Sequence, residues 1–310
     1  MARPSSPEKL SEKLSKENLS ALGYLAGWKV IGKLPNQLVT RLFNWGADKA
    51  SDNGHGMEML RRNLTRVVGA ENVTSDLVKT SVRSYARYWR EAFRLPQLAG
   101  DPGLIDSISD AFVGRDLLDR SINQGKGVIL TLPHSGNWDM AGMWLNTEYG
   151  QFTTVAERVK PEVLFEAFVE FRESLGFEVI ALTGEKVPPF QQLKQVLERG
   201  GIVCLLGERD LSERGVAANF FGEETTMPAG PAQLAIETGA PLHAVHCWFT
   251  GSDKDPGWGI SVSAPVEVTT LEDTVQRIAD LFAANIAAHP EDWHMLQPQW
   301  PVDKRKKRKK

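Results

Sequence analysis

The chain has 310 residues, of which 42% are hydrophobic and 24% are charged, and this composition excludes a disordered chain. Its length allows a large single domain or two modest ones with a sizeable core. Cys204 and Cys247 each lie in an apolar run that predicts a buried strand. This placement argues against a disulfide scaffold and favours a reducing, cytosolic setting.

The charge is distributed unevenly along the chain. The formal net charge is −3, but residues 304–310 are all basic and contribute +7, so the preceding residues together carry −10. This basic tail predicts either a solvated, disordered end or attachment to an anionic membrane surface. Nucleic acid is not an expected partner, because no other part of the chain forms a basic recognition element.

Two amphipathic helices are predicted between about residues 7 and 49, with an interruption near Leu34-Pro35. Basic residues and the candidate interfacial anchors Trp28 and Trp45 lie beside the apolar stripes, as in helices that lie in a membrane interface. The alternative is packing on the protein's own domain, the commoner fate of such stripes. No apolar run is long enough to span a bilayer and no secretory signal is evident, so we expect the protein to stay inside the cell.

In the rest of the chain, the sequence pattern first predicts helices over about residues 57–67 and 76–93. Short apolar runs then alternate with helical segments. The predicted strands are about 127–132, 153–156, 178–181, 202–206, 241–249 and 259–263. The predicted helices between and after them are about 137–146, 161–175, 189–198, 230–238 and 271–289. This alternation predicts an α/β fold with a mostly parallel central β-sheet flanked by helices, preceded by the amphipathic helical segment.

A candidate catalytic segment, His134-Ser-Gly-Asn-Trp-Asp139, directly follows the first of these strands. Open α/β sheets bind ligands beyond the carboxyl ends of their strands, where His134 is expected to lie. Asp139 then falls in the first turn of the next helix. From there its carboxylate is expected to contact one imidazole nitrogen, which leaves the other as a general base. The alternative is an Asn-capped loop whose histidine only satisfies backbone groups.

Charged residues also follow two other predicted strands. Glu208, Arg209 and Asp210 come directly after an apolar run, where three charges are costly to bury unless they are paired. We expect Glu208 to bind acceptor hydroxyls or to support His134, and Arg209 to hold a phosphate, with a local salt-bridge cluster as the alternative. Glu157 and Arg158 follow a third strand in the same way.

Other chemistries fit the sequence less well. It contains no dinucleotide-binding glycine fingerprint, Walker loop or Gly-x-Ser-x-Gly nucleophile elbow. His243 and His246 lie on an apolar strand without metal-ligand spacing, which predicts core histidines. Residues 220–222 and 227–231 predict a turn that leads into a helix and is suited to lining a thioester or acyl site.

Together these segments resemble the glycerophosphate/lysophospholipid acyltransferase superfamily, in particular its branch of lipid A late acyltransferases. Longer stretches, covering about residues 23–300, resemble the actinobacterial phosphatidylinositol mannoside acyltransferases. These stretches are residues 84–94, 132–142, 153–158, 173–178 and 293–300. One departure is that the superfamily commonly has Glu-Gly-Thr-Arg where this chain has Gly207-Glu-Arg-Asp210. A phosphate-binding role for Arg209 is therefore not carried over by motif.

The resemblance implies transfer of a fatty acyl group, preferably palmitoyl, from acyl-CoA to phosphatidylinositol mono- or dimannoside. The acceptor atom would be the 6-hydroxyl of the mannose on position 2 of inositol. The implied enzyme is peripheral on the cytoplasmic face of the inner membrane, and needs acyl-CoA as co-substrate but no cofactor or metal. Membrane-associating helices at residues 1–48 would precede an acyltransferase core at residues 49–302, followed by the basic tail at residues 303–310.

By motif, His134 carries over as the general base and Asp139 as its orienting partner, with Glu208 completing the catalytic group. We expect substrate contacts from Asn137, Trp138, Glu157, Arg158, Arg172 and Arg209. The alternatives are another lipid or glycolipid O-acyltransferase of lysophospholipid or lipid A type, an acyl thioesterase, and a non-catalytic lipid-binding protein.

Overall fold

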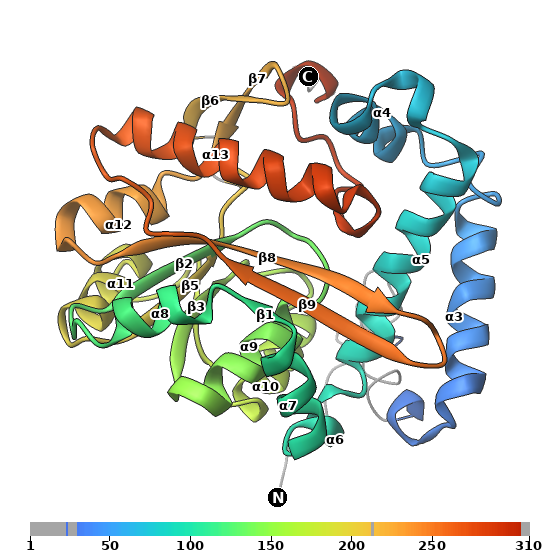
Figure 1. Ribbon diagram of the computed structural model, residues 1–310, viewed down its shortest axis with the longest axis horizontal. Coiled ribbons are helices and arrows are strands. Elements are labelled where there is room, and N and C mark those ends of the chain that lie inside the picture. The colour runs from blue at the N-terminus through green and yellow to red at the C-terminus, as the bar shows by residue number, and fades with distance from the viewer. Residues whose placement is uncertain (1–22, 24–29, 212–213, 305–310) are drawn as a thin grey trace, which may run out of the picture.

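A seven-stranded sheet forms the centre of the molecule (Figure 1). The computed structural model describes residues 23, 30–211 and 214–304, so most of the predicted first helix and of the basic tail lies outside the described residues. The strand order is β1-β9-β8-β2-β5-β3-β4, and every neighbouring pair is parallel except β8 and β9. The predicted α/β fold with a mostly parallel sheet is therefore confirmed.

The strands coincide closely with the predicted apolar runs. They are β1 (Phe112–Val113), β2 (Val128–Leu132), β3 (Phe152–Ala156), β4 (Glu178–Ala181), β5 (Ile202–Leu206), β8 (Leu242–Gly251) and β9 (Pro256–Val262). Strand β1 was not predicted, because two residues carry no periodic signal. All five residues of β2 are buried, as expected of a parallel strand covered on both faces.

Helices cover both faces of the sheet. One face packs against α11 (Pro189–Glu198), α12 (Gly230–Thr238) and α13 (Leu271–Ala288). The other packs against α7 (Pro102–Asp110), α8 (Arg115–Ile122), α9 (Trp138–Tyr149) and α10 (Glu162–Ser174). Strand β2 shows the division: Ile129 belongs to the first core, whereas Val128 and Leu130 belong to the second. Side chains of a strand alternate between faces, so one strand serves both cores.

The predicted turn at residues 220–222 is the tip of a hairpin that the sequence did not predict. Strands β6 (Val216–Phe220) and β7 (Glu223–Met227) pair antiparallel outside the main sheet. Phe221 and Gly222, which join them, have positive φ angles of 52° and 81°. A two-residue connection with both residues in this region is the turn that matches the twist of paired strands. The segment after β7 leads into α12, as predicted.

The N-terminal described helices form a layer beside the end of the sheet. Helix α3 (Asn36–Ala50) lies against α5 (Ser75–Ala92), and α4 (Glu58–Val68) and α6 (Leu95–Leu98) complete the layer. Asp48 of α3 accepts two hydrogen bonds from Arg83 of α5, both at 2.6 Å. The predicted boundary between residues 48 and 49 thus falls inside α3. None of the described helices is both long enough and apolar enough to cross a membrane.

The predicted core residues behave as expected. His243 and His246 are buried in β8, and His243 is hydrogen bonded through both ring nitrogens, to the Ser263 carbonyl and the Ser121 hydroxyl. Cys204 and Cys247 are free thiols. The histidine and cysteine predictions are therefore confirmed as features of the packed core.

Candidate active site

His134 lies at the carboxyl end of β2, as predicted, and the register of the sheet brings Glu208 beside it. Leu132 of β2 pairs with Leu206 of β5. His134 and Glu208 each come two residues after one of these paired leucines. Since neighbouring parallel strands leave the sheet at the same edge, the two side chains meet there.

The carboxylate of Glu208 orients the imidazole. Its Oε1 accepts a hydrogen bond from His134 Nδ1 at 2.6 Å and a second from the His134 backbone N–H at 2.7 Å. Glu208 is fully buried, whereas 27% of the His134 side chain is exposed. A proton on Nδ1 leaves the lone pair on Nε2, so this arrangement supplies a general base together with a group that stabilises the imidazolium.

The predicted contact between Asp139 and His134 is wrong. Asp139 does lie in the first turn of α9, but Oδ2 accepts from the Tyr88 hydroxyl and Oδ1 from Arg172 Nε, both at 2.8 Å. No hydrogen bond between Asp139 and His134 is present among the described residues. The reason is that the carboxylate points toward α5 and α10, whereas the imidazole turns toward β5.

Asp139 and Arg172 form a buried ion pair beneath the site. Burial opposes the charge on Arg172, but Asp139, with Tyr88, outweighs it and holds the pKa of the guanidinium above its ordinary value. Burial, together with the Asp139 charge, raises the pKa of the Tyr88 hydroxyl well above its usual range. Arg172 therefore stays charged and Tyr88 stays protonated across the physiological range, which keeps their hydrogen bonds to Asp139 in place.

His294 forms two hydrogen bonds with the loop that carries His134. Its backbone N–H donates to the His134 carbonyl at 2.8 Å, and its Nε2 donates to the Gly136 carbonyl at 2.9 Å. Burial lowers the pKa of His294 to about 3, so the ring is neutral. Gly136 has a φ of 56°, and a Cβ there would lie 2.6 Å from the Cys247 carbonyl, so glycine allows the close approach to β8.

A cleft of about 700 Å³ opens in front of His134. Its lining is largely apolar, and Glu157, Arg209 and Asp210 are among its charged residues. Residues 228–231, which lead into α12, line it as the sequence predicted. Its volume is in the range typical of small-molecule sites, and an apolar wall with a few polar groups is their usual character.

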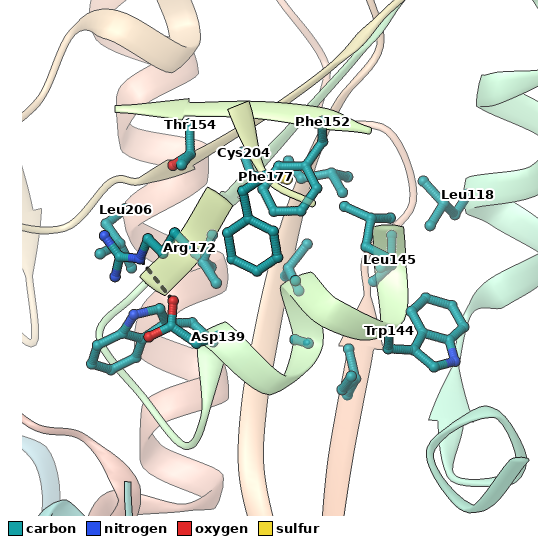
Figure 2. Close-up of a pocket in the computed structure, with 18 of the residues that line it drawn as sticks. Leu118, Asp139, Trp144, Leu145, Phe152, Thr154, Arg172, Phe177, Cys204 and Leu206 are labelled. Carbon is teal, nitrogen blue, oxygen red and sulfur yellow. Dashed lines mark hydrogen bonds and ion pairs between the residues drawn. The ribbon is translucent and has the colours of Figure 1, made fainter. Parts of the chain in front are cut away.

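A second, narrower cavity of about 70 Å³ lies between α9 and the sheet (Figure 2). Apart from Asp139, Arg172 and Thr154, its lining is almost entirely apolar and includes Phe152 and Phe177. Figure 2 shows the Asp139–Arg172 pair at one end of this cavity and the aromatic rings farther in. Trp138 and Arg172 line both the cavity and the cleft, so the two spaces adjoin at these side chains.

The remaining predicted substrate residues divide into two groups. Trp138, Glu157, Arg172 and Arg209 line the cleft, and Arg209 is hydrogen bonded to the side chain of Gln297. Asn137 is instead the buried N-cap of α9. Its Oδ1 accepts from the Met140 N–H at 2.9 Å and its Nδ2 donates to Glu91 at 2.8 Å, so its amide is used within the protein.

Arg158 is not part of the lining of the cleft. It forms an exposed ion pair with Glu162, its neighbour on the next turn, and its guanidinium lies 5.6 Å from the centre of the Phe165 ring. Charged side chains one turn apart pair readily on a surface. Of the charged pair Glu157-Arg158, the cleft therefore receives Glu157.

Tyr85 and Tyr88 were not predicted as site residues. Tyr88 stacks on Trp138 with 4.1 Å between ring centres, and both tyrosines line the cleft with Trp89. These three aromatic residues lie on one face of α5, because they are spaced three and four residues apart. The same stripe in the sequence was the signal that could have identified them.

Comparison with known proteins identifies the family of the chain. The family model described as bacterial lipid A biosynthesis acyltransferase matches residues 11–301. The chain belongs to this family, and it is an acyltransferase.

Two relatives are both named phosphatidylinositol mannoside acyltransferase. One, from Mycolicibacterium smegmatis, is 53% identical over 286 residues, which is 91% of each chain. The other, from Mycobacterium tuberculosis, is 50% identical over 284 residues, or 90% of this chain and 88% of the relative. The resemblance noted in the sequence is therefore confirmed.

Proposed function

We propose that this acyltransferase moves a fatty acyl group, preferably palmitoyl, from acyl-CoA to phosphatidylinositol mono- or dimannoside. The acceptor is the 6-hydroxyl of the mannose on position 2 of inositol. The observation that carries the chemistry is the 2.6 Å contact between His134 Nδ1 and Glu208. His134 lines a cleft that adjoins an apolar cavity. The acceptor class follows from the names of the two relatives.

In the proposed mechanism the acceptor attacks the thioester directly. Nε2 of His134 takes the proton of the mannose hydroxyl as its oxygen bonds to the thioester carbonyl carbon. Glu208 stabilises the imidazolium that forms. Collapse of the tetrahedral intermediate breaks the C–S bond, coenzyme A leaves as a thiolate, and the proton on the imidazolium passes to it. No enzyme nucleophile takes part, because the acceptor hydroxyl fills that role.

The two adjoining spaces fit the two ends of the acyl donor. The apolar cavity accepts the hydrocarbon chain, and the cleft accepts the thioester and pantetheine. The carbonyl then lies near Trp138 and Arg172, which line both spaces. The cavity is narrow, so a long chain requires its lining rings, among them Phe152 and Phe177, to move apart.

The polar side chains of the cleft are proposed to hold the acceptor. Glu157 is exposed within the cleft and suits the hydroxyls of a sugar, because a carboxylate accepts two or more hydrogen bonds. Arg209 suits a phosphate, which matches the planar fork of the guanidinium. Acyl-CoA and the acceptor lipid both carry phosphate groups, and the phosphate of the acceptor lipid is the one nearer to the acceptor sugar.

Access to this lipid requires contact with a membrane. On α3, Leu38, Leu42 and Trp45 are 55%, 54% and 61% exposed. Exposed apolar side chains on an amphipathic helix insert into the boundary between head groups and acyl chains. We propose that the enzyme is peripheral on the cytoplasmic face of the inner membrane, with this helix and the basic tail beside the lipid.

The decisive experiment is incubation of the full-length protein with palmitoyl-CoA and a panel of lysophospholipids and glycolipids, with the products identified by mass spectrometry. Acylated phosphatidylinositol mannoside is the expected product. Acylation of a lysophospholipid or of lipid A precursors alone would contradict the proposed acceptor. Release of coenzyme A at the same rate with and without acceptor would instead favour a thioesterase.

The role of His134 is tested by His134→Ala. The variant is expected to fold, because the imidazole is partly exposed, and to lose acylated product altogether. Normal turnover by a folded His134→Ala protein would refute the mechanism. Arg158→Ala is a matched control, since Arg158 lies outside the cleft and forms only surface contacts.

A further inference from the structure

An open apolar groove runs between α3 and α5, on the outer side of the aromatic stripe of α5. Its volume is about 470 Å³, and its lining is apolar: Leu42, Trp45, Gly46 and Ala50 from α3, with Tyr85 and Trp89 from α5. We call it the α3–α5 groove. Most of the α3 residues that line it are partly or fully exposed, so the hydrocarbon surface is unusually accessible for a folded protein.

The α3–α5 groove adjoins the catalytic cleft. Tyr85 and Trp89 line both spaces, so these two side chains lie between them. A molecule that reaches from one to the other passes over these two rings. A membrane-docking surface unrelated to substrate would not need this connection.

The groove and the cleft together offer the chemical groups that suit the parts of a glycosylated phospholipid. The lining of the groove is hydrocarbon. Tyr85 lines both spaces, and the surroundings of its hydroxyl include the positive charge of Arg209. His134 and Glu157 line the cleft but not the groove. A glycosylated phospholipid has acyl tails joined through a phosphate to sugar hydroxyls.

We propose that the α3–α5 groove binds the hydrocarbon tails of the acceptor lipid while its sugar lies in the cleft. This inference rests on the proposed function and names a separate subsite from the apolar cavity that takes the donor chain. The groove holds the acceptor at a fixed distance from the base, with the phosphate beside Arg209. Its volume falls within the range of known ligand sites.

The test uses substitutions that fill the groove with larger apolar side chains of the protein itself. A Cβ at Gly46 has no atom within 4 Å, so Gly46→Leu occupies the groove without a clash and replaces a poor helix former. Ala50→Leu fills the other end of the same lining. Gln37→Leu is the matched control, because it adds the same side chain to an exposed position of α3 outside the groove.

Each protein is assayed with palmitoyl-CoA and two acceptors in solution without vesicles. One is a dioctanoyl phosphatidylinositol dimannoside below its micelle concentration, and the other is the same head group after removal of both acyl chains. With the unmodified protein the diacyl acceptor is expected to have the lower KM. Gly46→Leu and Ala50→Leu are expected to lower kcat/KM for the diacyl acceptor about tenfold, which corresponds to the loss of the burial of roughly two methylene groups of the lipid tails. The kcat/KM for the deacylated acceptor is expected to stay unchanged.

The results separate the alternatives. Equal kcat/KM values for both acceptors in the unmodified protein, or an equal loss for both in the variants, would overturn the tail subsite. So would variants that change binding to anionic vesicles and leave both soluble acceptors unaffected, because the groove would then serve the bilayer. Transfer to neither acceptor by the unmodified protein would contradict the proposed function itself.

Discussion

Glu208→Gln separates orientation of the imidazole from stabilisation of its charge. The glutamine keeps the size of the side chain, and its amide oxygen accepts the same two hydrogen bonds from His134, which measure 2.6 and 2.7 Å in the native protein. What the variant removes is the negative charge opposite the imidazolium. We therefore expect kcat to fall while KM for both substrates stays nearly constant.

The size of the effect follows from the replacement of a charged hydrogen-bond acceptor by a neutral one. Bonds to charged groups contribute about 1.5–3 kcal/mol and neutral bonds about 0.5–1.5 kcal/mol, and the difference of about 1–1.5 kcal/mol corresponds to about a 5- to 13-fold loss in kcat. Stability should respond differently. Glu208 is fully buried, and no described residue hydrogen bonds to its second oxygen, Oε2. Because a neutral amide is less costly to bury than a carboxylate, the unfolding midpoint should stay level or rise.

The assay measures initial rates of acyl transfer across a range of acyl-CoA and acceptor concentrations, together with thermal unfolding of both proteins. A kcat within threefold of the native value, or a loss confined to KM, would refute the assignment of Glu208 as the partner of the base.

Three further predictions concern the surroundings of the base. Asp139→Asn should lower the free energy of unfolding by about 3–5 kcal/mol in chemical denaturation, because it leaves the buried cation of Arg172 without its partner; a change below 1 kcal/mol would show that the pair is not structural. Gly142→Ala should shift products toward shorter acyl chains when equimolar acyl-CoAs compete, because its Cβ would lie 2.6 Å from the Phe177 ring in the apolar cavity; an unchanged product mixture would place the acyl chain elsewhere. Burial raises the pKa of Asp292 from 3.8 to about 6, so the Asp292 carboxyl stays protonated to a higher pH in the folded state than in the unfolded state. Its stabilising contribution is complete below pH 4 and is lost by about pH 6, about 3 kcal/mol in all; Asp292→Asn should lack this part of the pH dependence, and identical stability profiles would contradict the shift.

Much of the fold could be predicted because it depends on local pattern. The bounds of β4, β5, α11 and α12 match the predicted ranges, since each is a short periodic segment bounded by glycine, proline or charge. The β6–β7 hairpin was missed because β7 is mostly polar, with Met227 as its single apolar residue. Gly222 was the remaining signal of its two-residue turn.

The candidate site was predicted in part. The sequence placed His134 at a strand exit and identified Glu208 as a charged residue at another, and both are adjacent in the structure. It assigned the imidazole contact to Asp139, because the two residues are close in the chain. Asn137 was assigned to substrate from its position within the motif, although it caps α9. Arg158 was assigned to substrate from its position after a third strand, although it pairs with Glu162 on the surface.

The sequence by itself therefore determined which segments form strands and helices, that a base follows β2, and which family the chain resembles. Those properties reside in periodicity and in short motifs. The tertiary structure decided that Glu208 rather than Asp139 orients His134. His134 and Glu208 are 74 positions apart in the chain and meet only through the register of β2 with β5. It also decided that the aromatic face of α5 separates the catalytic cleft from the α3–α5 groove, since helix packing determines which surfaces adjoin.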